Sequence, residues 1–404
     1  MAASYREILT TPGIPALLSA GFIARLPQAM VGIGLLTMLV QQTGLYSLAG
    51  GVAGTFTLAN ALVSPQISKQ VDRYGQSRVL PVVTVFSILM LLALIWAAHQ
   101  EAPAAIMFIL AALAGTMPNM PSMLRARWAC VFGHTPRLRT AYALDAVLAE
   151  MTYVIGPPLV IGLSVGLFAE AGPLLAVALL AVGMAGFLAQ RRTEPPVVER
   201  RQPGAARRLN SPALRGLVLG LAAMGVIGGA FDVALIAFAK AQGWPTSASY
   251  MLGAYALGSM LTGLAYGAVR IAAPLQRQLL IAVVLLATAT VLPGISTSVY
   301  MMTVMICIAG MAFSPAMIII LNLGTVIVPP AQLTEGLTWM SAGVSVGVAS
   351  GAAVAGLLID AHGAPAGFAV AVVAGVVMVA VAFAGRNALD AASTHEADPI
   401  EAGA

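Results

Sequence analysis

Residues 79–98 read Val-Leu-Pro-Val-Val-Thr-Val-Phe-Ser-Ile-Leu-Met-Leu-Leu-Ala-Leu-Ile-Trp-Ala-Ala, a stretch without a single charged side chain. A helix needs about 20 mostly apolar residues to cross the hydrocarbon core of a bilayer. Similar stretches recur along all 404 residues, of which 59% are hydrophobic and only 9% charged. A soluble domain carries roughly 25% charged residues. The composition therefore predicts an integral membrane protein built from helices.

Apolar stretches of helix length follow one another in two groups separated by a long polar segment. They predict an all-α integral membrane protein with twelve transmembrane helices, at approximately 13–40, 46–69, 79–98, 104–123, 141–168, 171–190, 214–239, 246–269, 277–298, 299–327, 334–358 and 365–385. The expected organisation is an N-terminal six-helix bundle (1–190), a cytoplasmic linker (191–213), a C-terminal six-helix bundle (214–385) and a cytoplasmic tail (386–404). Weak repetition favours two pseudo-symmetric halves, because Ala114-Gly115 reappears as Ala309-Gly310 and Thr140 as Thr334.

The basic residues predict the orientation of the chain, because cytoplasmic loops are enriched in Lys and Arg. If the N-terminus is cytoplasmic, 18 of the 20 Lys and Arg residues fall in cytoplasmic segments. Lys240 falls outside, and Arg25 lies within the first helix. We therefore expect a multi-pass protein of the plasma (inner) membrane with both termini in the cytoplasm. Topology accounts for the basic charge, which gives no indication of a nucleic-acid partner.

One charged loop lies between the second and third predicted helices, where Asp72, Arg73, Gly75 and Arg78 occur within Ser-Lys-Gln-Val-Asp-Arg-Tyr-Gly-Gln-Ser-Arg. It resembles the loop signature G-x-x-x-D-R-x-G-x-R/K-R/K of the major facilitator superfamily, although Ser68 replaces the usual first glycine. The resemblance implies that the loop braces a cytoplasmic gate. Gly75 permits a tight turn; the alternative is an ordinary charged turn.

Glu335, at the start of the predicted eleventh helix, has two open interpretations. It is well placed to stabilise the positive end of the helix dipole. It could instead pair with Arg73 across the two halves when the gate closes.

The fifth predicted helix contains Gly156-Pro157-Pro158 and, later, Gly162. This segment resembles the Gly-Pro element that the same superfamily associates with exporters, although its second glycine comes late. Proline bends a membrane helix and glycine allows close packing. The alternative is a proline kink without bearing on transport direction.

The resemblance covers essentially the whole chain and implies two bundles that rock about a cavity lined by helices 1, 4, 7 and 10. We expect a secondary transporter without cofactor or metal, monomeric in the lipid bilayer. Its partners would be protons and a small, largely apolar organic substrate, exported by proton antiport. The alternatives are an uptake symporter or facilitator and, from another class, a non-transporting receptor or scaffold. The sequence shows no enzymatic motif and no phosphate-binding loop for ATP.

Four ionisable residues fall inside apolar stretches, where an unpaired charge costs about 2.5–3.5 kcal/mol or more. Arg25 and Glu150 have matching predicted depths, so a salt bridge between them is possible, either as a switch or as a permanent lock. Asp145 is expected nearer the cytoplasmic boundary, in a gate or interfacial role. Asp232 has no basic residue at its depth and is a candidate to carry the coupling proton or to contact substrate; Glu150 is the other proton candidate.

Glycine recurs every fourth residue in the eleventh predicted helix, at Gly343, Gly347 and Gly351. Small residues at this spacing let two membrane helices approach closely. We interpret them as a packing face rather than as part of a binding site.

Overall fold

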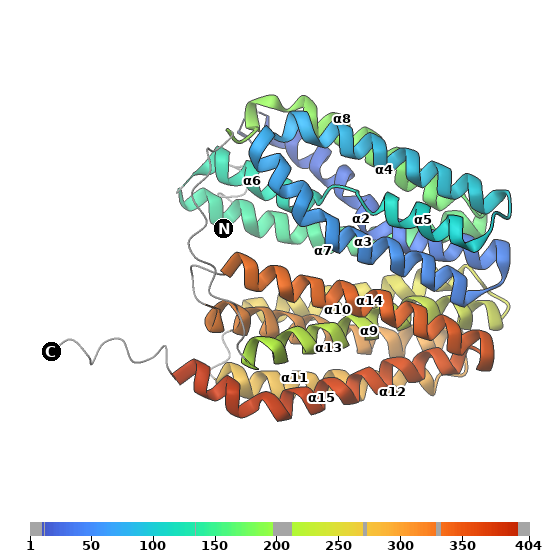
Figure 1. The fold of residues 1–404 in the computed structure, drawn as a ribbon. Helices are drawn as coiled ribbons and strands as arrows, with labels where there is room; N and C mark the ends of the chain where they lie inside the picture. The colour runs from blue at the N-terminus through green and yellow to red at the C-terminus, as the bar shows by residue number, and fades with distance from the viewer. Residues whose placement is uncertain are drawn as a thin grey trace. The chain divides into compact units, whose positions relative to one another are not determined.

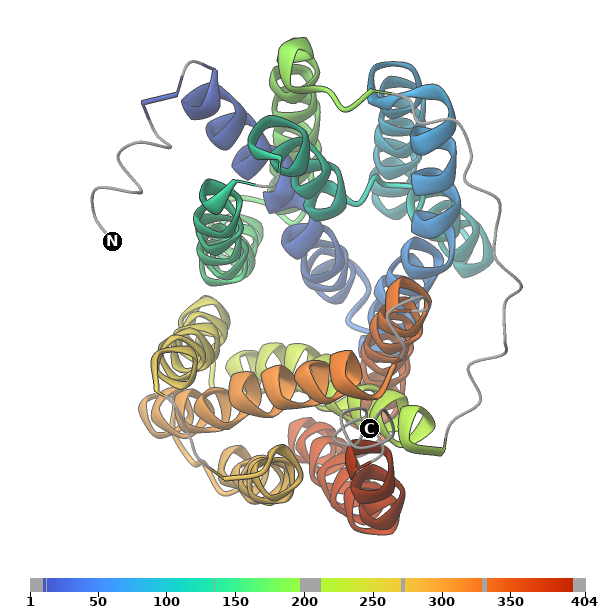
Figure 2. The same cartoon turned by 90° about the vertical axis from the view of Figure 1, so that its left-hand side faces the viewer.

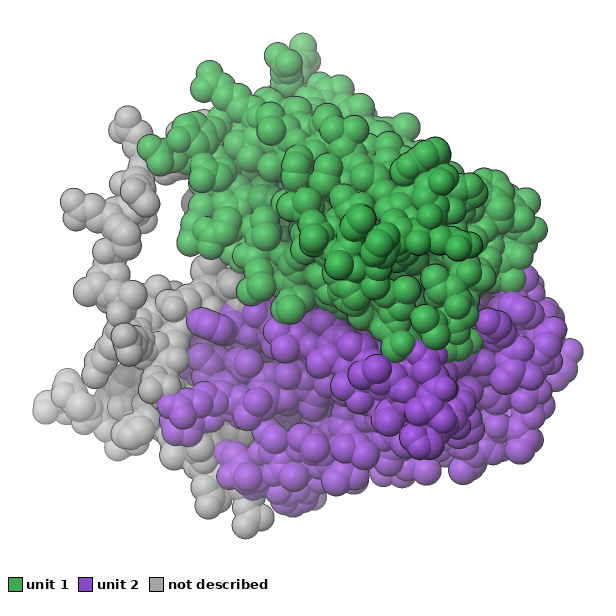
Figure 3. All heavy atoms as spheres, turned by 45° about the vertical axis from the view of Figure 1, so that its right-hand side comes forward, with its two compact units in different colours: residues 1–202 green, residues 203–404 purple. Residues whose placement is uncertain are grey.

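The computed structural model describes residues 10–11, 13–133, 135–196, 212–269, 273–328 and 333–394, and that part of the chain is helical without a strand. The chain divides into two compact units, Met1–Gln202 and Pro203–Ala404, coloured separately in Figure 3. The prediction of an all-α protein is confirmed, and each unit is described below by itself.

The N-terminal unit holds seven described α-helices and one short 3-10 helix (Figure 1). They are α2 (Ile14–Thr43), α3 (Tyr46–Tyr74), α4 (Gln76–His99), α5 (Ala104–Ala114), α6 (Met120–Phe132), α7 (Pro136–Gly166), α8 (Ala171–Ala189) and η1 (Arg191–Thr193).

The C-terminal unit holds seven described α-helices (Figure 1). They are α9 (Pro212–Ala241), α10 (Ser247–Ala268), α11 (Leu275–Ala289), α12 (Val291–Gly294), α13 (Val299–Ile327), α14 (Leu333–His362) and α15 (Ala364–Thr394).

Ten helical segments among the described residues are long and apolar enough to cross a membrane. All twelve predicted stretches are helical, but two differ from the expected single apolar span. The fourth is divided into α5 and α6 because Gly115 and Pro118 interrupt it, and the Asn119 side chain caps α6 by accepting a hydrogen bond from the Ser122 N–H. The eighth, α10, carries three tyrosines and several serines and glycines, which lower its hydropathy.

The glycine face predicted on the eleventh span is confirmed as a packing face in the C-terminal unit. α14 lies along α9 (Figure 2), and the two backbones meet at glycines. A Cβ added to Gly347 would overlap the Ala222 carbonyl oxygen, and one added to Gly351 would overlap that of Val226. A Cβ added to Gly225 of α9 would likewise overlap the Val344 carbonyl oxygen of α14. Helices in lipid have no hydrophobic driving force for association, so close backbone packing of this kind contributes to holding them together.

Close packing in the N-terminal unit centres on α2, which lies against α7 and α8. A Cβ on Gly183 of α8 would overlap the backbone of Ala24, so α8 occupies that side of α2. Around the ends of α2, α4, α6 and α8, an apolar core contains Leu17, Leu124, Trp128 and Phe187. Arg127, one of the two buried arginines described next, lies against this core at Phe187.

Candidate functional site

Three helices of the N-terminal unit bring their charges together at one buried carboxylate. Asp145 on α7 is fully buried, and Arg25 on α2 is 3% exposed. The Arg25 Nη2 donates to Asp145 Oδ1 at 2.7 Å, and Nη1 donates to the Asp145 backbone carbonyl at 3.1 Å. Arg125 of α6, which is 60% exposed, donates through Nε to Asp145 Oδ2 at 3.1 Å. Both carboxylate oxygens therefore accept charge-assisted hydrogen bonds.

This arrangement gives Arg25 a partner, Asp145, that the sequence analysis did not pair with it, and the predicted contact with Glu150 stays a prediction. Among the described side chains, the carboxylate bound to Arg25 is that of Asp145, and Glu150 lies outside the residues whose side chains the structure describes. The contact with Asp145 was missed because the fifth span was predicted to begin too late. α7 begins at Pro136 rather than at 141, so Asp145 lies about 13.5 Å along α7 while Arg25 lies about 16.5 Å along α2. The two residues therefore lie at similar distances from the starts of their helices, while the apolar span of α7 itself begins at Val147.

A second buried arginine, Arg127 on α6, was not singled out by the sequence analysis. It is fully buried. Its Nε donates to Gln76 Oε1 at 2.8 Å, and its Nη1 donates to the carbonyl oxygens of Phe187 at 2.8 Å and Gln190 at 2.9 Å. The guanidinium carbon also lies 3.7 Å from the centroid of the Phe187 ring. Arg127 thus joins the start of α4 to the end of α8.

Glu194, just after η1, extends this network. Its carboxylate accepts hydrogen bonds from the Ser77 backbone N–H at 2.7 Å and from the Ser77 hydroxyl. Burial opposes ionisation of Glu194, but the Ser77 hydrogen bonds and the positive charge of Arg127 outweigh it and hold the pKa below its usual range. The Arg127 network, defined as Gln76, Ser77, Arg127, Thr193 and Glu194, therefore ties α4 and α6 to the residues after α8.

The Arg127 network begins immediately after the charged loop. Gly75 separates α3 from α4 and has φ +89°, a conformation that favours glycine. Asp72, Arg73 and Arg78 are exposed. Among the described residues, Asp72 has no hydrogen bond or ion pair, while the Arg73 guanidinium lies 5.2 Å from the Tyr74 ring centroid. The loop is thus anchored by the residues that follow it. The only sequence signal for Arg127 was its place beside Trp128, just after the fourth predicted span.

Asp232, an acidic residue within α9 of the C-terminal unit, stands in a different environment. Asp232 on α9 is partly buried and, among the described residues, makes no hydrogen bond or ion pair. The neighbouring Phe231 ring packs edge-on against the Tyr255 ring of α10, with centroids 5.9 Å apart. The Tyr255 hydroxyl is buried without a hydrogen-bond partner and lies within electrostatic range of Asp232. Glu335 lies outside the residues whose side chains the structure describes.

The Gly-Pro element of the fifth span forms part of a helix contact. Pro157 and Pro158 lie inside the continuous helix α7. A Cβ on Gly156 would come within 3.1 Å of Met30 and 3.3 Å of Ala29, so Gly156 brings α7 close to α2. Gly162 has no such neighbour within 4 Å. Gly156 therefore acts in packing, and Gly162 does not share that role.

Comparison with known proteins identifies the family. The sequence profile of the Major Facilitator Superfamily matches residues 17–273, which is more than half of the chain. The chain belongs to the major facilitator superfamily. It is accordingly a membrane transport protein and not an enzyme. No protein with curated annotation matches it significantly by sequence.

Solved structures of major facilitator transporters share its fold. A bacterial homologue of the iron transporter ferroportin, in an inward-facing state, is 15% identical with a TM-score of 0.69, covering 91% of this chain and 98% of its own. The nucleoside transporter NupG is 15% identical, with a TM-score of 0.68 and coverage of 93% and 99%. The human organic anion transporter MFSD10 is 16% identical, with a TM-score of 0.62 and coverage of 92% and 100%. At these identities the similarity establishes the superfamily fold.

Proposed function

We propose that this chain is a proton-coupled exporter of a small, largely apolar organic compound. We place it in the plasma (inner) membrane with both termini in the cytoplasm, because that orientation puts 18 of its 20 basic residues on the cytoplasmic side. The Gly-Pro element on α7 supports export through its resemblance to the exporter motif. The low content of charged residues in the spans supports a largely apolar substrate.

The observation that carries proton coupling is the contrast between Asp232 and Asp145. Protonating Asp145 would remove charge-assisted hydrogen bonds to two guanidinium groups, so we assign it to a structural lock of α2, α6 and α7. Asp232 has no such bonds among the described residues. A membrane carboxyl group without a basic neighbour can take up and release a proton without breaking an ion pair.

Tyr255 is the natural companion of Asp232 in this mechanism. A phenol can donate to an ionised carboxylate and accept from a protonated one. Its hydroxyl has no hydrogen-bond partner in this structure, so it is available to either form of Asp232 once the side chains reorient. Substrate and proton would then compete for Asp232, which is the minimal requirement for antiport.

The experiment uses proteoliposomes with an imposed pH gradient and a transported compound selected by a thermal-shift screen of the purified protein. Asp232→Asn is expected to abolish proton-driven accumulation while downhill exchange remains measurable. Tyr255→Phe is expected to weaken coupling with less effect on exchange, since the ring contacts are kept. If coupling survives in Asp232→Asn and is lost in Glu150→Gln, the coupling site lies in the N-terminal half.

The same vesicles distinguish the alternatives. An uptake symporter would accumulate the compound in the direction of proton flow, and a facilitator would equilibrate it without responding to the gradient. A receptor or scaffold would bind the compound without net flux. For either orientation of the imposed gradient, antiport moves the compound against the direction of proton flow, and symport moves it with that flow. The direction of accumulation therefore separates the two.

A further inference from the structure

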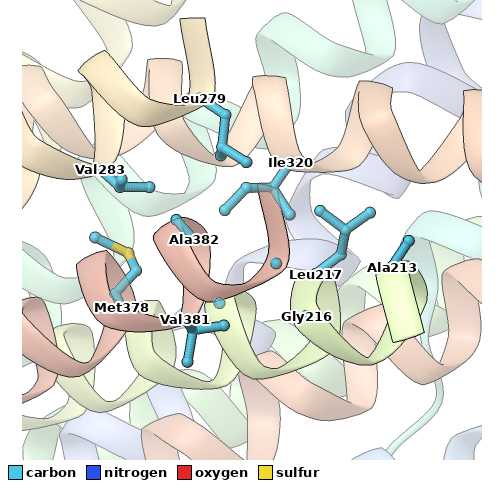
Figure 4. Close-up of a pocket in the computed structure, with 11 residues that line it drawn as sticks. Ala213, Gly216, Leu217, Leu279, Val283, Ile320, Met378, Val381 and Ala382 are labelled. Atoms are coloured by element: carbon cyan, nitrogen blue, oxygen red, sulfur yellow. The ribbon is translucent and has the colours of Figure 1, made fainter. Parts of the chain in front are cut away.

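An apolar groove opens in the C-terminal unit beside the first turns of α9. Figure 4 shows side chains from four helices converging on it, among them Leu217 of α9, Leu279 of α11, Ile320 of α13 and Met378 of α15. The groove is shallow and open along one side. Its lining consists only of alanine, glycine, leucine, valine, isoleucine and methionine. Because none of these side chains can hydrogen-bond a polar solute, the groove suits a hydrocarbon chain.

Glycines keep the groove open. A Cβ added to Gly216 of α9 or Gly385 of α15 would meet no atom of a neighbouring element within 4 Å. A Cβ on Gly220 would come no closer than 3.8 Å to Ile320. Protein interiors are normally packed with few voids. The groove therefore lies where glycines of α9 and α15 leave space unfilled. The glycines between α9 and α14 differ, because there the two backbones are in contact.

Basic side chains stand at the same end of the unit as the groove. Arg215 precedes Gly216 on α9, and Arg277 lies two residues before Leu279 on α11; both are exposed. The apolar span of α15 ends here as well, at Gly385. Arg215 already takes part in an interaction, but the five N–H donors of a guanidinium allow it to bind an anion as well. In the proposed topology this end of the unit lies at the inner leaflet.

We propose that the groove is a binding site for an anionic phospholipid of the inner leaflet. One acyl chain lies along the groove, and Arg215 and Arg277 bind the phosphate of the headgroup. Juxtamembrane basic residues attract anionic lipid headgroups, and basic pockets between membrane helices bind them specifically. The site rests on the proposed topology and on no assumption about substrate or proton coupling. Because α9 also carries Asp232, lipid binding would brace the inner end of the helix that bears the proposed coupling carboxylate.

The test measures lipid binding to the purified full-length protein in detergent by native mass spectrometry. The probes are dioleoyl phosphatidylglycerol and dioleoyl phosphatidylcholine, which have the same chains but differ in net headgroup charge. Phosphatidylglycerol is expected to bind more tightly. The double variant Arg215→Gln/Arg277→Gln is expected to weaken its binding roughly 10- to 30-fold and to weaken phosphatidylcholine binding much less, because the choline group already offsets the phosphate charge. Gly216→Leu, which fills the groove, is expected to weaken both lipids.

The matched control is Arg191→Gln/Arg192→Gln, which removes the same charge from two exposed arginines of the N-terminal unit. It is expected to leave the tight phosphatidylglycerol site intact. The proposal is overturned if both lipids bind equally, if the control weakens phosphatidylglycerol as much as the test variant, or if Gly216→Leu changes neither affinity. Binding is measured without transport, so failure of the lipid site and failure of proton-coupled export give separate results.

Discussion

The two buried arginines of the N-terminal unit are stabilised in different ways. Arg25 depends on one carboxylate, whereas Arg127 depends mainly on carbonyl oxygens, an amide and an aromatic ring. Removing one member of a buried ion pair leaves the other charge uncompensated, at a cost of about 3–5 kcal/mol. We therefore expect Asp145→Asn to destabilise the protein strongly. Arg125→Gln should cost less than about 1 kcal/mol, because Arg125 is 60% exposed.

Thermal unfolding in detergent measures both effects, and a double-mutant cycle tests the pairing itself. Arg25→Met combined with Asp145→Asn should be more stable than the sum of the two single changes allows, because neither charge is then left alone. A double variant as unstable as that sum would contradict the pairing.

Glu170 should make the stability of the protein depend on pH. It lies at the outer end of the same unit in the proposed topology. Its Oε1 accepts a hydrogen bond from Gln42 Nε2 at 2.7 Å and lies 2.9 Å from His99 Nδ1. Burial opposes ionisation, but His99 and Gln42 together lower the pKa of Glu170 below its ordinary 4.5. A depressed pKa means that this stabilisation is present above about pH 4.5 and is lost as the pH falls through the folded-state value.

Glu170→Gln should therefore reduce the loss of apparent melting temperature between about pH 5 and pH 3. It should not abolish that loss, because the depressed pKa of Glu194 acts in the same direction. Glu101→Gln, at an exposed residue near His99, is the matched control and should leave the pH profile unchanged. An identical profile for Glu170→Gln and the wild type would refute the assignment.

At the scale of elements, the contact between α9 and α14 depends on glycines that meet backbone atoms. A backbone carbonyl cannot move aside as the end of a side chain can, so Gly347→Ala should separate the helices and cost about 1–3 kcal/mol. Gly228→Ala on α9 is the matched control, since its Cβ would meet nothing within 4 Å, and it should be neutral or slightly stabilising. Thermal unfolding of the two variants side by side measures the difference, and equal stabilities would show that this contact is not close.

At the scale of the whole molecule, the charged loop is proposed to brace the cytoplasmic gate. The Arg127 network anchors the start of α4, which follows the loop directly, while Asp72 is exposed and without a bond among the described residues. We expect Asp72→Asn to reduce flux and to increase cytoplasmic accessibility without abolishing ligand binding. Transport assays and cysteine labelling of cavity positions measure these effects. Unchanged flux together with unchanged labelling would exclude the gate role.

Apolar stretches and their length were sufficient to predict the helical membrane fold, because each lipid-exposed backbone must satisfy its own hydrogen bonds within a helix. The glycine spacing likewise predicted the face on α14, since small residues every fourth position align on one side of a helix. Which carboxylate binds Arg25 was decided by the actual start of α7 and by the packing of α2, α6 and α7. The Arg127 network also needed the tertiary structure, because its members come from segments more than 50 residues apart. Local sequence sets where a charge lies along its helix, and only packing between helices decides which charges meet.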